Sequence, residues 1–291
     1  GVIVIGGGTT LDVGKAIAGL AKQEGGPEIA DFQIGKRTIN PKKALPWIAL
    51  PTTSGTGSES TNNAVIELGE EKRSIRNIPP PSMIIADPSF TDSLPLSYTI
   101  VSLVDAVAQS LEVITHAKAS PEIQSVAVAA FLNLAQGLKA LTVDQENALR
   151  PEMRDTLSWG SLLMGIAFAH AGLALPHALV HYCKKFHLSH GQMVGILLAP
   201  GLQVQAVHNP ETALRLARTE QALAAANQGH ILSLSFEDKA AQPLSLTFSQ
   251  LLSWLEDSIS KLCEQVSLAT SLQQAGLSHT DLEWIAAQEY A

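Results

Sequence analysis

The first third of the chain alternates short apolar runs with glycine-rich loops. The runs are rich in valine and isoleucine, which predicts strands at 2–5, 47–50, 63–68, 72–77 and 83–86. One helix is expected over 10–22, and its place between the first two strands favours a parallel crossover. The turn "GEE" between 63–68 and 72–77 predicts a β-hairpin. This region is therefore expected to be an α/β unit.

From Leu96 onward the spacing of apolar residues is helical, with alanine and leucine dominating. Helices are predicted at 97–116, 122–141, 148–170, 173–186, 191–207, 211–226 and 247–265, with two short ones near the C-terminus. Prolines 121, 151 and 210 lie near helix starts, where proline is well tolerated. The pattern predicts two domains, an α/β domain over 1–93 and an all-helical domain over 94–291.

Composition and charge exclude several classes of function. The 291 residues are 46% hydrophobic and 16% charged, as in a well-buried globular protein. The net charge is −8, and the basic residues are scattered, so no nucleic-acid partner is expected. Apolar runs such as "SLLMGIAFAHAGLAL" are shorter than the ~20 residues of a membrane span. No signal peptide is recognised, so a cytoplasmic protein is expected. The chain opens inside a strand, which suggests that an N-terminal part is missing.

Two glycine-rich loops each follow a predicted strand. In "VIVIGGGTTLDVGK" the glycines allow close approach of a ligand, and the start of the helix favours an anion such as a diphosphate. The stretch matches neither a Walker A loop nor the full dinucleotide fingerprint, so an ordinary tight turn stays open. The second loop, "LPTTSGTGSES", offers hydroxyl groups and bare backbone. Because loops at the carboxyl ends of strands converge on one crevice, both predict a nucleotide site.

Asp105 stands among apolar residues in the middle of a predicted helix, where a carboxylate needs a partner or a cation. Gln109, one turn later, adds a neutral oxygen. His177 and His181 share one face of another helix, and His190 follows after a short connection. One aspartate with two or three histidines suits a divalent ion such as iron(II) or zinc. The alternative is that these histidines are ordinary polar-face residues.

Together these stretches resemble the iron-containing (group III) alcohol dehydrogenase family. The resemblance lies in "GGGTTLDVGK", "LPTTSGTGSE", "IIADPSFTDSLP", "VDAVAQSLE" and "PHALVHYCKKFHLSHG", which occur in the family's order over nearly the whole chain. It implies a dinucleotide-binding α/β domain and a helical domain with the active site between them, an architecture shared with dehydroquinate synthase. It also implies a small alcohol or aldehyde substrate, NAD or NADP as cofactor, and a homo-oligomer, often a dimer.

The resemblance also assigns roles to residues. The cofactor positions it implies are Gly7, Gly8, Thr9, Asp12, Thr52, Thr53, Thr56 and Lys72. Asp105, His177 and His190 match metal ligands, with iron(II) as the first choice and zinc as the second. His181 matches a histidine near the nicotinamide, and its ordinary pKa near 6.5 suits proton transfer.

The sequence departs from the family's pattern near the metal ligands. Leu103 stands where a glycine is usual, and Gln109 stands where a fourth ligand is usually histidine. The connection from His177 to His190 is one residue shorter than in many members. A three-ligand site of the kind found in glycerol dehydrogenases would tolerate the change, with Gln109 coordinating weakly. The alternatives are a metal-free reductase resembling maleylacetate reductases and a non-catalytic nucleotide-binding relative. A cyclase resembling dehydroquinate synthase would need more basic residues than the cleft segments offer.

Overall fold

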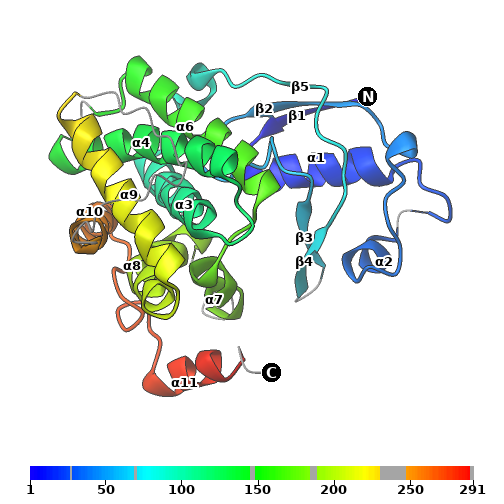
Figure 1. Cartoon of the computed structure of the whole chain (residues 1–291). Helices are drawn as coiled ribbons and strands as arrows, with labels where there is room; N and C mark the ends of the chain where they lie inside the picture. The colour runs from blue at the N-terminus through cyan, green and yellow to red at the C-terminus, as the bar shows by residue number, and fades with distance from the viewer. Residues whose placement is uncertain (27, 69–70, 145–147, 184–188, 230–246, 289–291) are drawn as a thin grey trace.

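The computed structural model describes the whole chain except residues 27, 69–70, 145–147, 184–188, 230–246 and 289–291. The side chains of residues 71, 72, 181–183 and 288 also lie outside the described part. Strands and the longest N-terminal helix gather at one end of the molecule, and long helices fill the other (Figure 1). This division matches the predicted fold class. The exact domain boundary stays a prediction.

The N-terminal region contains a parallel sheet and a separate hairpin. Its elements are β1 (Val2–Gly6), α1 (Gly8–Leu20), α2 (Ile29–Gln33), β2 (Trp47–Pro51), β3 (Ala64–Leu68), β4 (Glu71–Ile75) and β5 (Met83–Ile84). The sheet has the order β1-β2-β5, and both pairings are parallel. β3 and β4 pair antiparallel, with Ala64 opposite Ile75. The predicted parallel crossover and hairpin are therefore confirmed.

Helix α1 lies between the parallel sheet and the hairpin. Leu11 packs with Val4 and Ala49 of the sheet, and Leu20 packs with Ile75 of the hairpin. A Cβ atom at Gly14 would lie 2.3 Å from Val4 Cγ2, so glycine lets the helix approach β1 closely. The face of β1 that points away from α1 is exposed to solvent, since side chains along a strand alternate between the two faces of a sheet. The loops that follow β1 and β2 are thereby held at one edge of the sheet.

The C-terminal region is built from long helices. They are α3 (Leu96–Thr115), α4 (Pro121–Val143), α6 (Pro151–His170), α7 (Leu175–Cys183), α8 (His190–His208), α9 (Pro210–Asn227), α10 (Ser249–Gln265) and α11 (His279–Gln288). Ser120 caps α4 by accepting from the Ile123 N–H, and Pro121 follows it at the first helical position. Asn209 caps α9 in the same way, before Pro210. These local signals explain why several predicted starts are accurate.

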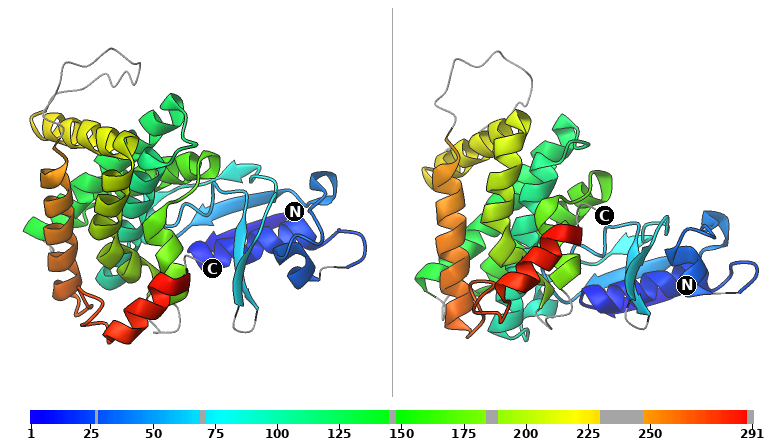
Figure 2. Two further views of the ribbon diagram at one scale, coloured as in Figure 1. Left: turned by 60° about the horizontal axis from the view of Figure 1, so that its bottom comes forward. Right: turned by 90° about the horizontal axis from the view of Figure 1, so that it is seen from below.

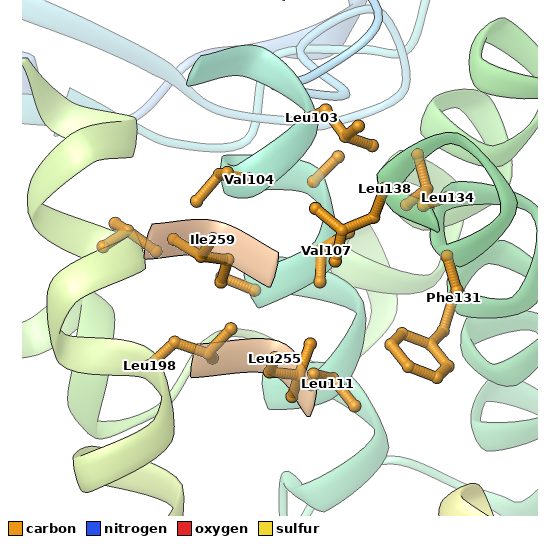
Figure 3. Packing of buried hydrophobic residues seen from close by; sticks show 14 of the residues in the cluster. Leu103, Val104, Val107, Leu111, Phe131, Leu134, Leu138, Leu198, Leu255 and Ile259 are labelled. Carbon is orange, nitrogen blue, oxygen red and sulfur yellow. The ribbon is translucent and has the colours of Figure 1, made fainter. Parts of the chain in front are cut away.

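Helix α3 runs through the middle of the helical region. It packs against α4 on one side and against α8 and α10 on the other (Figure 3). Val107 and Leu111 of α3 are not exposed at all. Burying one such side chain contributes about 1.5–3 kcal/mol to the free energy of unfolding. The polar residues of α3 therefore lie inside a tightly packed helix bundle.

Two described helices, α3 and α4, are long and apolar enough to cross a membrane by length and composition. In α3, 83% of the most apolar window is buried within the fold, and in α4 the share is 50%. Both contribute to the same hydrophobic core, which accounts for their apolar composition. Contiguous apolar runs alone did not indicate these windows, because polar residues interrupt both helices.

Some predicted elements are wrong or differ in length. Residues 272–276 form turns, so only one of the two short C-terminal helices is present, α11. The predicted helix 148–170 is interrupted, because Leu149 and Arg150 are not helical and α6 begins at Pro151. Helix α2 was not predicted, since five residues are too few to show a period. The last residues of the predicted helix 173–186 lie outside the described residues.

Candidate metal and cofactor site

Helix α3 places Asp105 inside the helical region. Its side chain is only 5% exposed, and its Oδ2 accepts a hydrogen bond from Gln109 Nε2 at 3.0 Å, one turn later. Figure 2 shows that α7 and the start of α8 lie on the side of the helical region that faces the strands. The carboxylate of Asp105 is thus available to residues from these two helices.

The two histidines predicted as ligands meet Asp105. His177 Nε2 lies 3.2 Å from Asp105 Oδ1, and His190 Nε2 lies 3.7 Å from the same oxygen. The ligand atoms of the three residues all lie within 4.8 Å of one another. At Gly191 a Cβ atom would lie 2.4 Å from the Val101 carbonyl oxygen, so glycine lets the start of α8 press against α3. This close approach brings His190 to the site.

Electrostatic interactions tie these groups together. Burial alone would raise the pKa of Asp105, but its hydrogen bond with His177 and the charges of His190 and His177 hold that pKa below its usual value. Burial alone would lower the pKa of His177, but hydrogen bonds to Asp105 and Glu112 raise it to about 10. Without a cation, His177 therefore carries a proton that a metal ion would have to replace.

The donor set fits a divalent metal ion. One carboxylate and two imidazoles match the ligand types of zinc and iron(II) sites with a position open for substrate. Gln109 Oε1 is buried and has no hydrogen-bond partner in the part of the chain that the structure describes. An orphaned buried acceptor is costly, and a nearby cation would satisfy it. The structure therefore brings three of the four predicted metal residues, Asp105, His177 and His190, into one cluster, and Gln109 is hydrogen-bonded to Asp105 beside it.

The two glycine-rich loops pack against each other. A Cβ atom at Gly7 would lie 3.1 Å from Thr53 Cγ2, and one at Gly8 would lie 2.6 Å from Thr56 Cγ2. The Thr52 N–H donates to the Gly6 carbonyl oxygen at 3.1 Å. The two loops thus form one continuous surface at the carboxyl ends of β1 and β2. This is the edge at which parallel α/β sheets bind nucleotides.

The start of α1 is suited to an anion. Its N-cap residue is Gly7, and no side chain caps the helix. Thr9 is exposed in the first turn. The first N–H groups of a helix lack partners within the helix and attract negative charge. The start of α1 therefore offers free N–H groups at the place where the diphosphate was predicted to bind.

Asp12 is engaged in contacts within the protein. Its Oδ1 accepts from Ser58 Oγ at 2.5 Å, and its Oδ2 accepts from the Val65 N–H at 3.0 Å. Lys15 Nζ lies 3.0 Å from Asp12 Oδ1 and donates to the Ser58 carbonyl oxygen at 2.8 Å. Lys15 is not exposed. Asp12 and Lys15 thus connect α1 to the second glycine-rich loop. Sequence reasoning missed this role of Lys15.

Glu59, in the same loop, is a buried carboxyl group that sequence reasoning also missed. Burial raises its pKa to about 7, against the lowering effects of its own backbone N–H and of Lys15. An unfolded glutamate titrates near 4.5. Between these two values the unfolded chain loses a proton that the folded chain keeps. Stability therefore falls as pH rises from about 4.5 to 7.

We expect Glu59→Gln to raise the free energy of unfolding at pH 8 by about 1–3 kcal/mol and to change it little at pH 4.5. The amide has nearly the shape of the protonated acid but is never charged. Urea unfolding at both pH values measures the difference. Glu256→Gln, at an exposed carboxylate, is the control. Equal effects of Glu59→Gln at the two pH values would contradict this account.

Two residues with predicted roles are placed only by their backbone. His181 lies in α7, one helical turn after His177. Lys72 lies in β4, opposite Glu67 in the hairpin. The side chains of His181 and Lys72 lie outside the described residues. Their roles stay predictions.

Comparison with protein-family models identifies both halves of the chain. Residues 1–88 match the model described as iron-containing alcohol dehydrogenase, and residues 99–291 match the C-terminal model of the same family. The chain belongs to the iron-containing alcohol dehydrogenase family. The resemblance inferred from the sequence motifs is therefore confirmed.

Curated relatives in this family are alcohol dehydrogenases. Long-chain-alcohol dehydrogenase 1 of Geobacillus thermodenitrificans is 38% identical over 202 residues, which cover 68% of this chain and 49% of the relative. The 1-propanol dehydrogenase PduQ of Citrobacter freundii is 34% identical and covers 76% of this chain and 55% of its own length. The chain spans about half the length of the curated relatives it matches.

Solved structures show the same fold. A sulfoacetaldehyde reductase from Bifidobacterium kashiwanohense in complex with NAD+ matches with a TM-score of 0.75 and 24% identity, covering 97% of this chain and 68% of that one. A maleylacetate reductase from Agrobacterium tumefaciens matches with a TM-score of 0.70 and 22% identity, covering 99% of this chain and 67% of that one. At these identities the likeness concerns the fold alone.

Proposed function

We propose that this protein is a metal-dependent oxidoreductase that interconverts a small alcohol and its aldehyde with a nicotinamide cofactor. The observation that carries the proposal is the cluster of Asp105, His177 and His190, whose ligand atoms lie within 4.8 Å of one another. Membership of the iron-containing alcohol dehydrogenase family supports the reaction type. The named activities of the curated relatives support an alcohol as substrate.

Asp105, His177 and His190 would hold the metal ion, and Gln109 would offer its amide oxygen as a weaker fourth ligand. A bound divalent ion polarises the oxygen of an alcohol or aldehyde and lowers the pKa of the alcohol. We propose iron(II) as the resident ion, with zinc as the alternative, because both accept this mixture of oxygen and nitrogen donors. The burial of Asp105 keeps water from competing for the carboxylate.

The surface formed by the two glycine-rich loops would bind the cofactor. Bound NAD accepts or returns the hydride. Its diphosphate would meet the uncapped start of α1 at Gly7 and Gly8, and Thr53 and Thr56 would contact the dinucleotide from the second loop. The complex of the sulfoacetaldehyde reductase with NAD+ supports NAD. NADP is the alternative.

His181 is proposed to carry the proton that the alcohol releases. Its position in α7, one helical turn after His177, supports this role. We expect His181→Ala to lower kcat by about 10²–10⁴-fold while the metal content stays unchanged. Steady-state rates and metal analysis of the same preparation measure both quantities. Loss of the metal along with the activity would contradict the assigned role.

Rates of NAD reduction with a panel of primary alcohols, after reconstitution with iron(II) or with zinc, test the proposed function. The proposal predicts turnover that appears on addition of metal and disappears with a chelator. Turnover that persists in the chelator would instead indicate a metal-free reductase. Tight cofactor binding without turnover of any alcohol would indicate a non-catalytic relative.

A further inference from the structure

Glu112 is a buried carboxylate of α3 that none of the roles above uses. Its side chain is not exposed at all, and it lies two helical turns after Asp105, on the same face of the helix. An isolated charge in such a position would be very costly. The partners that Glu112 has found therefore indicate what it does.

All the side-chain hydrogen bonds that the structure describes for Glu112 go to the first turn of α7 and the residue before it. Oε1 accepts from the backbone N–H of Ala174 at 3.0 Å and from that of His177 at 3.2 Å. Oε2 accepts from His177 Nδ1. The carboxylate thus caps the start of α7, where backbone N–H groups lack partners within the helix. It also holds the imidazole of the same helix.

The bond to Nδ1 decides which nitrogen of His177 faces the cluster. With Nδ1–H donating to Glu112, Nε2 points at Asp105 Oδ1, 3.2 Å away. Only the nitrogen without a proton can bind a metal ion, and a carboxylate on the other nitrogen fixes that choice and makes the ring a better donor. Glu112 and Asp105 thus hold His177 between them, one through each ring nitrogen.

We propose that Glu112 is a positioning residue that fixes the ring orientation and tautomer of His177 for metal binding through Nε2. The inference rests on the proposed metal site but assigns a residue outside it. Glu112 acts through His177 and does not touch the metal ion. Because one carboxylate both caps α7 and bonds the imidazole, the helix and its ligand are set in place together.

The variant Glu112→Gln separates these two tasks. Glutamine keeps one oxygen for the backbone N–H groups of α7, but its other group is an N–H donor. An N–H facing Nδ1 requires the tautomer with its proton on Nε2, which cannot bind metal. We expect the dissociation constant for zinc to rise about 10–100-fold, as for other losses of a carboxylate behind a histidine ligand. Competition with a chromophoric chelator measures it.

The melting temperature of the metal-free protein distinguishes positioning from capping. A lower melting temperature with unchanged zinc affinity would show that Glu112 is only a helix cap, which would overturn the inference. Ser110→Ala is the matched control, since Ser110 is a buried residue of the same helix and bonds only the Val107 carbonyl oxygen among the described contacts. That control should leave zinc affinity unchanged.

A second measurement holds even where Glu112→Gln fails to fold. In zinc-loaded wild-type protein labelled with ¹⁵N-histidine, the chemical shifts of His177 should report a proton on Nδ1 and the metal on Nε2. The opposite assignment would overturn the inference while leaving the metal site intact. No zinc binding by the wild-type protein would overturn the proposed metal site and the inference together.

Discussion

Replacing Asp105 with alanine is expected to abolish metal binding and to lower turnover more than 100-fold. Losing a group that hydrogen-bonds to a metal ligand already lowers metal affinity or activity by about 10–100-fold. Losing the ligand itself should lower them further. Asp105 is also the group that brings His177 and His190 together, because both imidazoles point at its Oδ1. Metal analysis and steady-state rates of the same preparation measure the two effects.

The matched control is Asp155→Ala, which removes an exposed aspartate from α6. It should leave metal content and turnover unchanged. Asp105→Asn keeps the size of the side chain but removes its charge, and we expect it to lose the metal as well. Full metal content and turnover in Asp105→Ala would show that the cluster is not the catalytic centre.

Replacing Gly57 with alanine is expected to lower the free energy of unfolding by about 2–5 kcal/mol. Gly57 has a φ of +60°, which costs a residue with a Cβ atom roughly 1–2 kcal/mol. Its Cβ would also lie 2.5 Å from Gly165 Cα in α6, and relieving such a clash costs about 1–3 kcal/mol more. Urea unfolding at constant pH measures the loss.

Gly276→Ala separates the two costs of the Gly57 substitution. Gly276 has a φ of +87°, but no atom lies within 4 Å of the position that a Cβ would take. It should lose only the conformational part. An equal loss at both positions would show that the contact with Gly165 is not tight. Since Gly57 belongs to the second glycine-rich loop, this contact fixes that loop against the helical region.

The fold was predictable where the signal is local. Strand alternation and helical periodicity gave the parallel strands, the hairpin and most helices, and Ser120 followed by Pro121 marked the start of α4 correctly. The predictions were wrong where a stretch is too short for its pattern to distinguish a helix from a turn. Residues 272–276 combine apolar and polar residues in a helix-like order, but they form turns against the core.

The metal cluster was predictable from the spacing of its residues along the chain and from the apolar neighbours of Asp105. Asp105 is a carboxylate in an apolar helix, and His177 and His190 match metal ligands in the family's motifs. Glu112 was overlooked, since its partner His177 lies 65 residues away and only packing brings them together. Lys15 and Glu59 were overlooked for the same reason, because their burial depends on how the two loops meet.

The metal content of the wild-type protein, purified without chelator and measured by plasma mass spectrometry, tests the central claim most directly. All three proposed ligands lie within this chain, and metal content is measured without a substrate. The account predicts close to one iron or zinc ion per chain, lost in Asp105→Ala. A wild-type protein that binds neither ion, even after reconstitution, would contradict it.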